Sequence, residues 1–163
     1  MTEEIILGGG AIWTLEALLG MTKGIVSVNN GYYKIGEYKS LAFDKDDRLE
    51  VVSVKYDNQE ISLETILDIF YFSHDPSLVS WEKEECFYPA NRSAIIYFNP
   101  EHEPIIKNKI SEHTKLLHGD KFIFIKEDKY NNFFINTPDD QFSQSIIIPK
   151  VERFKNYFKE MLK

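Results

Sequence analysis

Cysteine is scarce in this sequence, which has 163 residues and a single cysteine, Cys86. One cysteine excludes an intrachain disulfide framework and a zinc site built from several cysteines. Such low usage is typical of proteins of a reducing compartment, so we expect a cytoplasmic location. Any thiol chemistry of this chain has to use Cys86.

Basic charge and long apolar runs are also in short supply. Lys and Arg number 19 against 26 Asp and Glu, a net charge of −7. Binding to a phosphate backbone needs a clustered basic face, so we expect no nucleic-acid partner. No segment approaches the roughly 20 apolar residues that cross a bilayer. The acidic start Met1-Thr2-Glu3-Glu4 is not that of a signal peptide, so we expect no membrane association.

Apolar and aromatic residues are plentiful. Hydrophobic residues make up 43% of the sequence and aromatic residues 14%. This composition is enough for a core rich in large rings. With neither internal repeats nor low-complexity tracts, the sequence predicts a single domain over residues 1–163.

Hydrophobic periodicity predicts strands interleaved with helices. We expect strands at residues 4–7, 24–31, 49–56 and 94–98, and short strands at 121–126 and 133–135 around a hairpin-like 128–132. Asn29-Asn30-Gly31 predicts a turn at the end of the second strand. Helices are expected at 12–21, 62–70, 100–117 and after Pro149, with Ser62 as an N-cap and His74 beyond the end of the second helix. The order predicts an α+β sandwich, although alternation alone also permits a parallel α/β sheet.

Three glycines, Gly8-Gly9-Gly10, separate the first predicted strand from the first helix. Glycine permits tight backbone turns and a close approach to a helix N-terminus. No Gly-Lys-Ser/Thr follows and the dinucleotide fingerprint is absent, so this is not a phosphate loop. An anion such as a thiolate at residue 11 would be stabilised by the helix dipole.

The run Gly-Gly-Gly-x-x-Trp-x-x-Glu over residues 8–16 resembles the active-site stretch of the A-type peptide methionine sulfoxide reductases. Further motifs resemble that family in the same order: Lys23-Gly24-Ile25, Gly31-Tyr32, Glu50-Val51-Val52, Tyr56-Asp57, Ile61-Ser62, His74-Asp75-Pro76 and Arg92-Ser93-Ala94-Ile95. The family-like core spans about residues 4–125, and the predicted strand and helix of residues 130–163 are more divergent. The resemblance implies a ferredoxin-like two-layer α+β sandwich, with helices packed on a mainly antiparallel sheet.

The resemblance also implies a chemistry, peptide-methionine (S)-S-oxide reduction, which repairs oxidative damage. In that family a cysteine thiolate attacks the sulfoxide sulfur, a glutamic acid donates a proton and tyrosines assist. The positions that match are Ala11 for the nucleophile, Ile12 for the neighbouring aromatic residue, Trp13, Tyr32 for one tyrosine and Glu50 for the acid. An alanine methyl group cannot attack sulfur.

Other departures point the same way. Asn91 stands where the family has its second tyrosine, and no second cysteine is present to resolve a sulfenic acid, so we expect no thioredoxin partner. We expect no cofactor, and the spacing of His102, His113 and His118 predicts no metal site. The sequence predicts a pseudoenzyme that binds methionine sulfoxide, in a peptide or free, or a similar ligand. The expected contacts are those of Ile12, Trp13, Tyr32 and Glu50.

Two other functions stay open from the sequence. Cys86 aligns near the family's active-site aspartate and could serve as a relocated thiol, although nearby carboxylates raise the pKa of a thiol and weaken it as a nucleophile. Alternatively, the pocket has closed and the chain is a non-catalytic partner-binding domain. Glu50 has two interpretations as well: a solvent-facing strand residue, or a buried acid that shares a face with Val52 and Val54.

Overall fold

The structure is a computed structural model that describes residues 1–9, 12–34, 48–74, 93–114, 123–126, 133–135 and 148–163. Its elements, in chain order, are β1 (Thr2–Gly8), α1 (Ile12–Gly20), β2 (Ile25–Lys34), β3 (Arg48–Asp57), α2 (Leu63–Ser73), β4 (Ala94–Tyr97), α3 (His102–Thr114), β5 (Ile123–Lys126), β6 (Phe133–Ile135), α4 (Ile148–Tyr157) and a 3₁₀ turn, Lys159–Met161.

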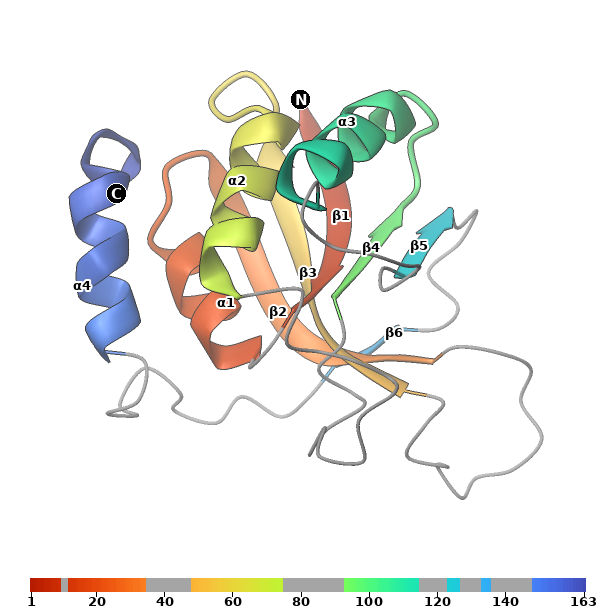
Figure 1. The fold of residues 1–163 in the computed structure, drawn as a ribbon, viewed down its shortest axis with the longest axis horizontal. Helices are drawn as coiled ribbons and strands as arrows, with labels where there is room; N and C mark the ends of the chain where they lie inside the picture. Colours follow the sequence, from red (N-terminus) through yellow and green to blue (C-terminus); the bar gives the residue numbers. More distant parts are fainter. Residues whose placement is uncertain (10–11, 35–47, 75–92, 115–122, 127–132, 136–147) are drawn as a thin grey trace.

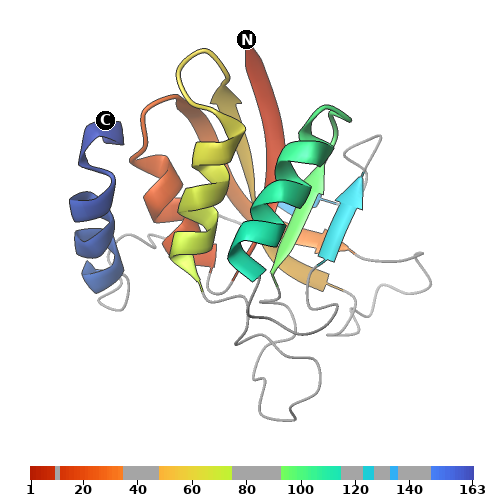
Figure 2. The ribbon, with the colours of Figure 1, turned by 45° about the horizontal axis from the view of Figure 1, so that its top comes forward.

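The strands form one sheet in the order β5-β4-β1-β3-β2-β6. Every pairing is antiparallel except that of β4 with β5. Helices α1, α2 and α3 lie side by side on one face of this sheet, and α4 packs against α1 (Figures 1 and 2). The α+β prediction is confirmed, and a wholly parallel sheet is wrong.

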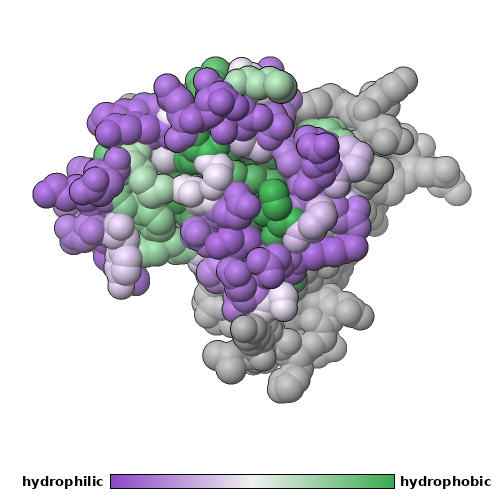
Figure 3. Space-filling model, turned by 90° about the horizontal axis from the view of Figure 1, so that it is seen from above, coloured by the Kyte–Doolittle hydropathy of each residue, from purple (hydrophilic) through white to green (hydrophobic). Residues whose placement is uncertain are grey.

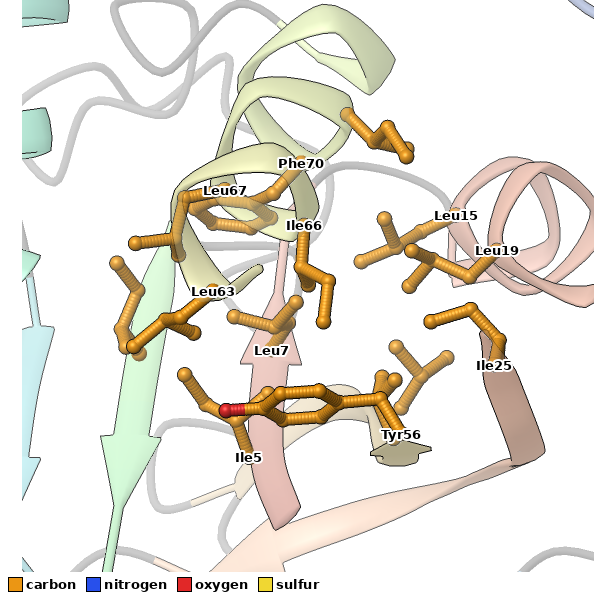
Figure 4. Close-up of a cluster of buried hydrophobic side chains, with 14 of the residues drawn as sticks. Ile5, Leu7, Leu15, Leu19, Ile25, Tyr56, Leu63, Ile66, Leu67 and Phe70 are labelled. Atoms are coloured by element: carbon orange, nitrogen blue, oxygen red, sulfur yellow. The ribbon is translucent and has the colours of Figure 1, made fainter. Parts of the chain in front are cut away.

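The core lies between the sheet and helices α1 and α2. Ile5, Leu7 and Tyr56 of the strands point toward Leu15 of α1 and Phe70 of α2 (Figure 4). All five side chains are fully buried. Burying a large apolar side chain stabilises a fold by about 1.5 to 3 kcal/mol. This packing therefore holds the ends of both helices in place over the sheet.

The predicted N-cap of α2 is confirmed, and the helix runs to Ser73, three residues beyond the predicted end at residue 70. Ser62 is its N-cap, with the Thr65 backbone N–H donating to Ser62 Oγ at 3.2 Å, and His74 is its C-cap. The cap satisfies one of the backbone N–H groups that the first helical turn leaves without a partner. The direction of α2 is thus set locally at its start, and the helix ends where the His-Asp-Pro motif begins.

The turn predicted at Asn29-Asn30-Gly31 is wrong. Strand β2 continues through these residues to Lys34, with Asn30 paired to Val52 and Gly31 paired to Val51. These residues pair with β3 on one side, and Gly31 also pairs with β6 on the other side. This backbone pairing overrides the local preference of Asn and Gly for turns. Tyr32 is therefore a strand residue and not the residue after a turn.

The hairpin predicted around 128–132 is also wrong. Strand β5 lies beside β4 at one edge of the sheet, whereas β6 lies beside β2 at the other edge. The chain reaches β5 from β4 through α3, which is the helical crossover that a parallel pair requires. A hairpin signal in the sequence could not reveal this separation, because both strands are short and pair with distant partners.

None of the described helices is both long enough and apolar enough to span a membrane. The end of the molecule where the N-terminus lies has a mostly hydrophilic surface, with apolar residues visible between the hydrophilic ones (Figure 3). At this end the N-terminal ammonium group lies 2.8 Å from Asp57 Oδ1.

Candidate functional site

Four elements meet at the end of the sheet opposite the N-terminus: the end of β1, the start of α1, the end of α2 and the start of β4 (Figure 1). Gly8, the last residue of β1, pairs with Ala94, the first residue of β4. The glycine run follows directly, so the chain turns from strand to helix at this point.

Gly9 lies against the imidazole ring of His74. A Cβ atom at position 9 would come within 2.5 Å of His74 Cε1 and 2.7 Å of Nδ1, closer than real side chains approach. The need for glycine here is steric, since the ring occupies the space that a side chain would need. The β1–α1 turn and the end of α2 are therefore fitted to each other.

Hydrogen bonds fix the orientation of that ring. His74 Nδ1 lies 2.9 Å from the Phe70 carbonyl oxygen, and Nε2 lies 3.0 Å from Ser93 Oγ. Because a carbonyl oxygen only accepts, we assign the ring proton to Nδ1, which in the neutral ring leaves Nε2 to accept from the Ser93 hydroxyl. Through these contacts His74, the first residue of the His-Asp-Pro motif, connects the glycine run with the Arg-Ser-Ala-Ile motif. The sequence identified it only as the residue that ends a helix.

Tyr32 and Glu50 are direct partners across strands β2 and β3. Glu50 alternates with the buried Val52, so both partners face the side of the sheet that carries the helices. Leu7 pairs with Val52, so Gly8 and Gly9 follow at the end of the sheet where Glu50 lies. Glu50 shares a face with Val52, as the alternation predicts, and it is half-buried, which lies between the solvent-facing and the buried interpretation; Tyr32 is half-buried as well.

Trp13 and Glu16 project from the first two turns of α1. Trp13 is half-buried and packs against the main core, and Glu16 Oε1 accepts a 2.9 Å hydrogen bond from Asn30 Nδ2. Burial raises the pKa of the Glu16 carboxyl, and the bond from Asn30 offsets only part of this rise. The sequence missed this pair because Asn30 looked like a turn residue. Its alternation with Val28 and Tyr32 was the available signal.

The remaining predicted residues cannot be placed in this geometry. Ala11, Cys86 and Asn91 lie outside the described residues, as does the side chain of Ile12, although its backbone begins α1. Of the predicted site residues, the described part of the chain brings together Tyr32 and Glu50, at the end of the sheet where β1 ends and α1 begins.

One further cluster has the residue types of a metal site. Carboxylate and imidazole atoms of Asp68, Glu112 and His113 lie within 4.8 Å of one another on α2 and α3. Lys109 Nζ lies 2.7 Å from Asp68 and 3.3 Å from Glu112, and the hydrogen bond to Asp68 raises the pKa of this lysine. A lysine ammonium group already pairs with both carboxylates, so the cluster is an ion-pair network between two helices.

Sequence comparisons agree with this arrangement. The profile of the family described as "Peptide methionine sulfoxide reductase" matches residues 3–159. A protein of Campylobacter jejuni named peptide methionine sulfoxide reductase MsrA is 32% identical, over 94% of this chain and 99% of its own length. Another MsrA, from Pasteurella multocida, is 28% identical over the full length of both chains.

Solved structures match the fold. Mxr1 from Saccharomyces cerevisiae, in an unusual oxidised form, aligns with a TM-score of 0.58 and 25% identity, over 82% of this chain and 75% of that one. Methionine sulfoxide reductase A of Corynebacterium diphtheriae aligns with a TM-score of 0.62 over 98% of this chain and 74% of that one. Its identity is 18%, so this second likeness concerns the fold alone.

Proposed function

We propose that this chain, which belongs to the peptide methionine sulfoxide reductase family, binds methionine sulfoxide or a similar ligand without reducing it. The observation that carries this proposal is the pairing of Tyr32 with Glu50 beside the glycine turn, in a sequence whose residue 11 is alanine. In this proposal Tyr32 and Glu50 supply the polar groups of the site, while Ala11 places a methyl group at the position of the attacking group.

Reduction of a sulfoxide by this family's route starts with a thiolate. The thiolate attacks the sulfoxide sulfur, the oxygen passes to the cysteine as sulfenic acid, and the methionine thioether leaves. Ala11 has no lone pair for this attack. No second cysteine is available to resolve a sulfenic acid, so we propose no cycle with thioredoxin.

Binding of a sulfoxide requires hydrogen-bond donors and apolar contact, but no nucleophile. A sulfoxide oxygen accepts hydrogen bonds, which the Tyr32 phenol supplies and the Glu50 carboxyl supplies in its protonated form. The Trp13 ring, half-buried at the start of α1, offers apolar contact to the methyl group of the ligand. The single cysteine and acidic composition lead us to propose that one domain of residues 1–163 does this in the cytoplasm.

The first test is incubation with a methionine sulfoxide peptide and excess dithiothreitol. We expect no turnover by the natural chain, measured as thioether product. Turnover that disappears in Cys86→Ser would establish a relocated thiol and overturn the proposal. A companion titration follows Trp fluorescence with the same peptide. No binding at millimolar peptide would instead indicate a closed pocket and a partner-binding domain.

Restoring the thiol sharpens the same test. We expect Ala11→Cys to show weak reductase activity at best, because Asn91 does not supply a second phenol. The double variant Ala11→Cys/Asn91→Tyr is the matched comparison, and its activity should exceed that of the single variant. Equal and robust activity in both would show that the second phenol is not needed here.

A further inference from the structure

We infer that Glu16 and Asn30 form a positioning pair that sets Trp13 and Tyr32 at the spacing the ligand requires. The inference rests on the proposed binding function and adds residues that lie beside the proposed ligand contacts. It is carried by the hydrogen bond between the two side chains and by the place of each on its element.

The pair joins helix α1 to strand β2 with a directional contact. Otherwise α1 rests on the sheet through apolar side chains such as Leu15, Leu18 and Leu19, all fully buried. The hydrophobic effect is non-directional, so a hydrogen bond adds a directional constraint that these apolar contacts do not supply. The bond from Asn30 Nδ2 to Glu16 Oε1, at 2.9 Å, defines one position of the helix on the strand.

Each end of this bond adjoins a residue of the proposed binding site. Glu16 lies three residues after Trp13, so the two share one side of α1. Asn30 lies two residues before Tyr32, so the two share one face of β2. Fixing Glu16 against Asn30 thereby sets the position of the first turns of α1, which carry Trp13, relative to the part of β2 that carries Tyr32.

The burial of Asn30 supports a role in positioning. Asn30 is only 5% exposed, and its Oδ1 has no hydrogen-bond partner among the described residues, so the bond from Nδ2 to Glu16 is the polar contact that holds this side chain there. Replacing both members of such a polar pair by apolar residues of similar size changes net stability little, whereas removing one member leaves the other without its partner. We therefore expect the double variant Asn30→Leu/Glu16→Met to lose ligand affinity with little loss of stability.

The experiment compares ligand affinity with stability in matched variants, all carrying Trp81→Phe so that Trp13 reports alone. Asn30→Leu and Glu16→Met remove the bond, and Glu16→Gln keeps an acceptor for Asn30 Nδ2. The control Ser53→Ala removes the 2.8 Å bond from Ser53 Oγ to Glu4, which lies on the other face of the same sheet. The probe is a tripeptide with a central methionine sulfoxide, followed by Trp13 fluorescence.

We expect Asn30→Leu and Glu16→Met each to weaken binding about fivefold, as for one lost hydrogen bond, and the double variant to be no weaker than either single one. Glu16→Gln and Ser53→Ala should bind within about twofold of the parent. Equal affinity in all variants would overturn the inference. So would an affinity loss in Ser53→Ala as large as that in Asn30→Leu.

A second measurement separates this inference from the proposed function. If the parent protein binds no probe, the proposed function fails, but acrylamide quenching of Trp13 in ligand-free protein still tests the pair. Quenching should rise in Asn30→Leu and Glu16→Met and stay unchanged in Glu16→Gln and Ser53→Ala. Unchanged quenching in the first two variants would refute the positioning role by itself.

Discussion

The two ends of the helix-covered face both carry partly buried carboxyl groups, but their partners differ. At the end near the N-terminus, Glu3 Oε2 accepts from the Tyr56 hydroxyl at 2.8 Å and lies 2.9 Å from His102 Nε2. At the site end, Glu16 accepts one hydrogen bond, from Asn30.

The pKa values of the two glutamates move in opposite directions for this reason. Burial disfavours ionisation of both, but at Glu3 the hydrogen bonds from His102 and Tyr56 outweigh burial and lower the pKa. At Glu16 burial outweighs the single bond and raises the pKa. The far end is built around an ionised acceptor that ties β1, β3 and α3 together. The site end keeps a carboxyl that takes up a proton more readily.

The largest effect is expected at the site end, from Gly9→Ala. The new methyl group meets the His74 ring, and such overpacking costs about 1 to 3 kcal/mol of the free energy of unfolding. Urea denaturation measures this loss. The double variant Gly9→Ala/His74→Ala should lose less than the sum of the two single variants, because removing the ring makes room for the methyl group. Strict additivity would show that the turn tolerates a side chain beside the ring.

At the far end, His102→Ala should cost about 1 to 3 kcal/mol, since it leaves the partly buried Glu3 carboxylate with one fewer partner. Urea denaturation compares it with Lys107→Ala, which removes an exposed ion pair to Glu103 and should cost less than about 0.5 kcal/mol. Affinity for the sulfoxide peptide should not change in either variant. A loss of affinity in His102→Ala would show that the two ends are coupled.

The smallest effect concerns pH. Glu3, with a lowered pKa, contributes stability above the ordinary glutamate pKa, and this is lost as the pH falls through its folded-state value. Glu16, with a raised pKa, contributes stability below the ordinary value, and this is lost as the pH rises through its folded-state value.

The variants Glu3→Gln and Glu16→Gln test these signs. Melting temperatures between pH 3 and pH 7 should fall less steeply toward acid in Glu3→Gln than in the natural chain. In Glu16→Gln the decline that Glu16 causes between mildly acidic and neutral pH should disappear. Parallel pH curves for all three proteins would contradict the contrast between the two ends.

Much of the fold could be predicted because its signals are local. The alternation of residues along β3 predicted that Glu50 lies on the same face of the sheet as Val52, and Ser62 marked the start of α2. The failures occurred where distant partners decide. Asn30 and Gly31 have turn preferences, yet pairing with β3 keeps them in a strand, and the short strands β5 and β6 take partners at opposite edges.

The sequence by itself determined that residue 11 carries no thiol, that Cys86 is the one cysteine, and that strands and helices alternate. The first two follow from composition, and the third follows from apolar residues that repeat every two residues in strands and about every four in helices. Only the tertiary structure decided that Gly9 rests on His74, that Tyr32 faces Glu50, and that Asn30 holds Glu16. Those contacts join elements that are far apart in the chain, so they depend on how the whole core packs and not on any local pattern.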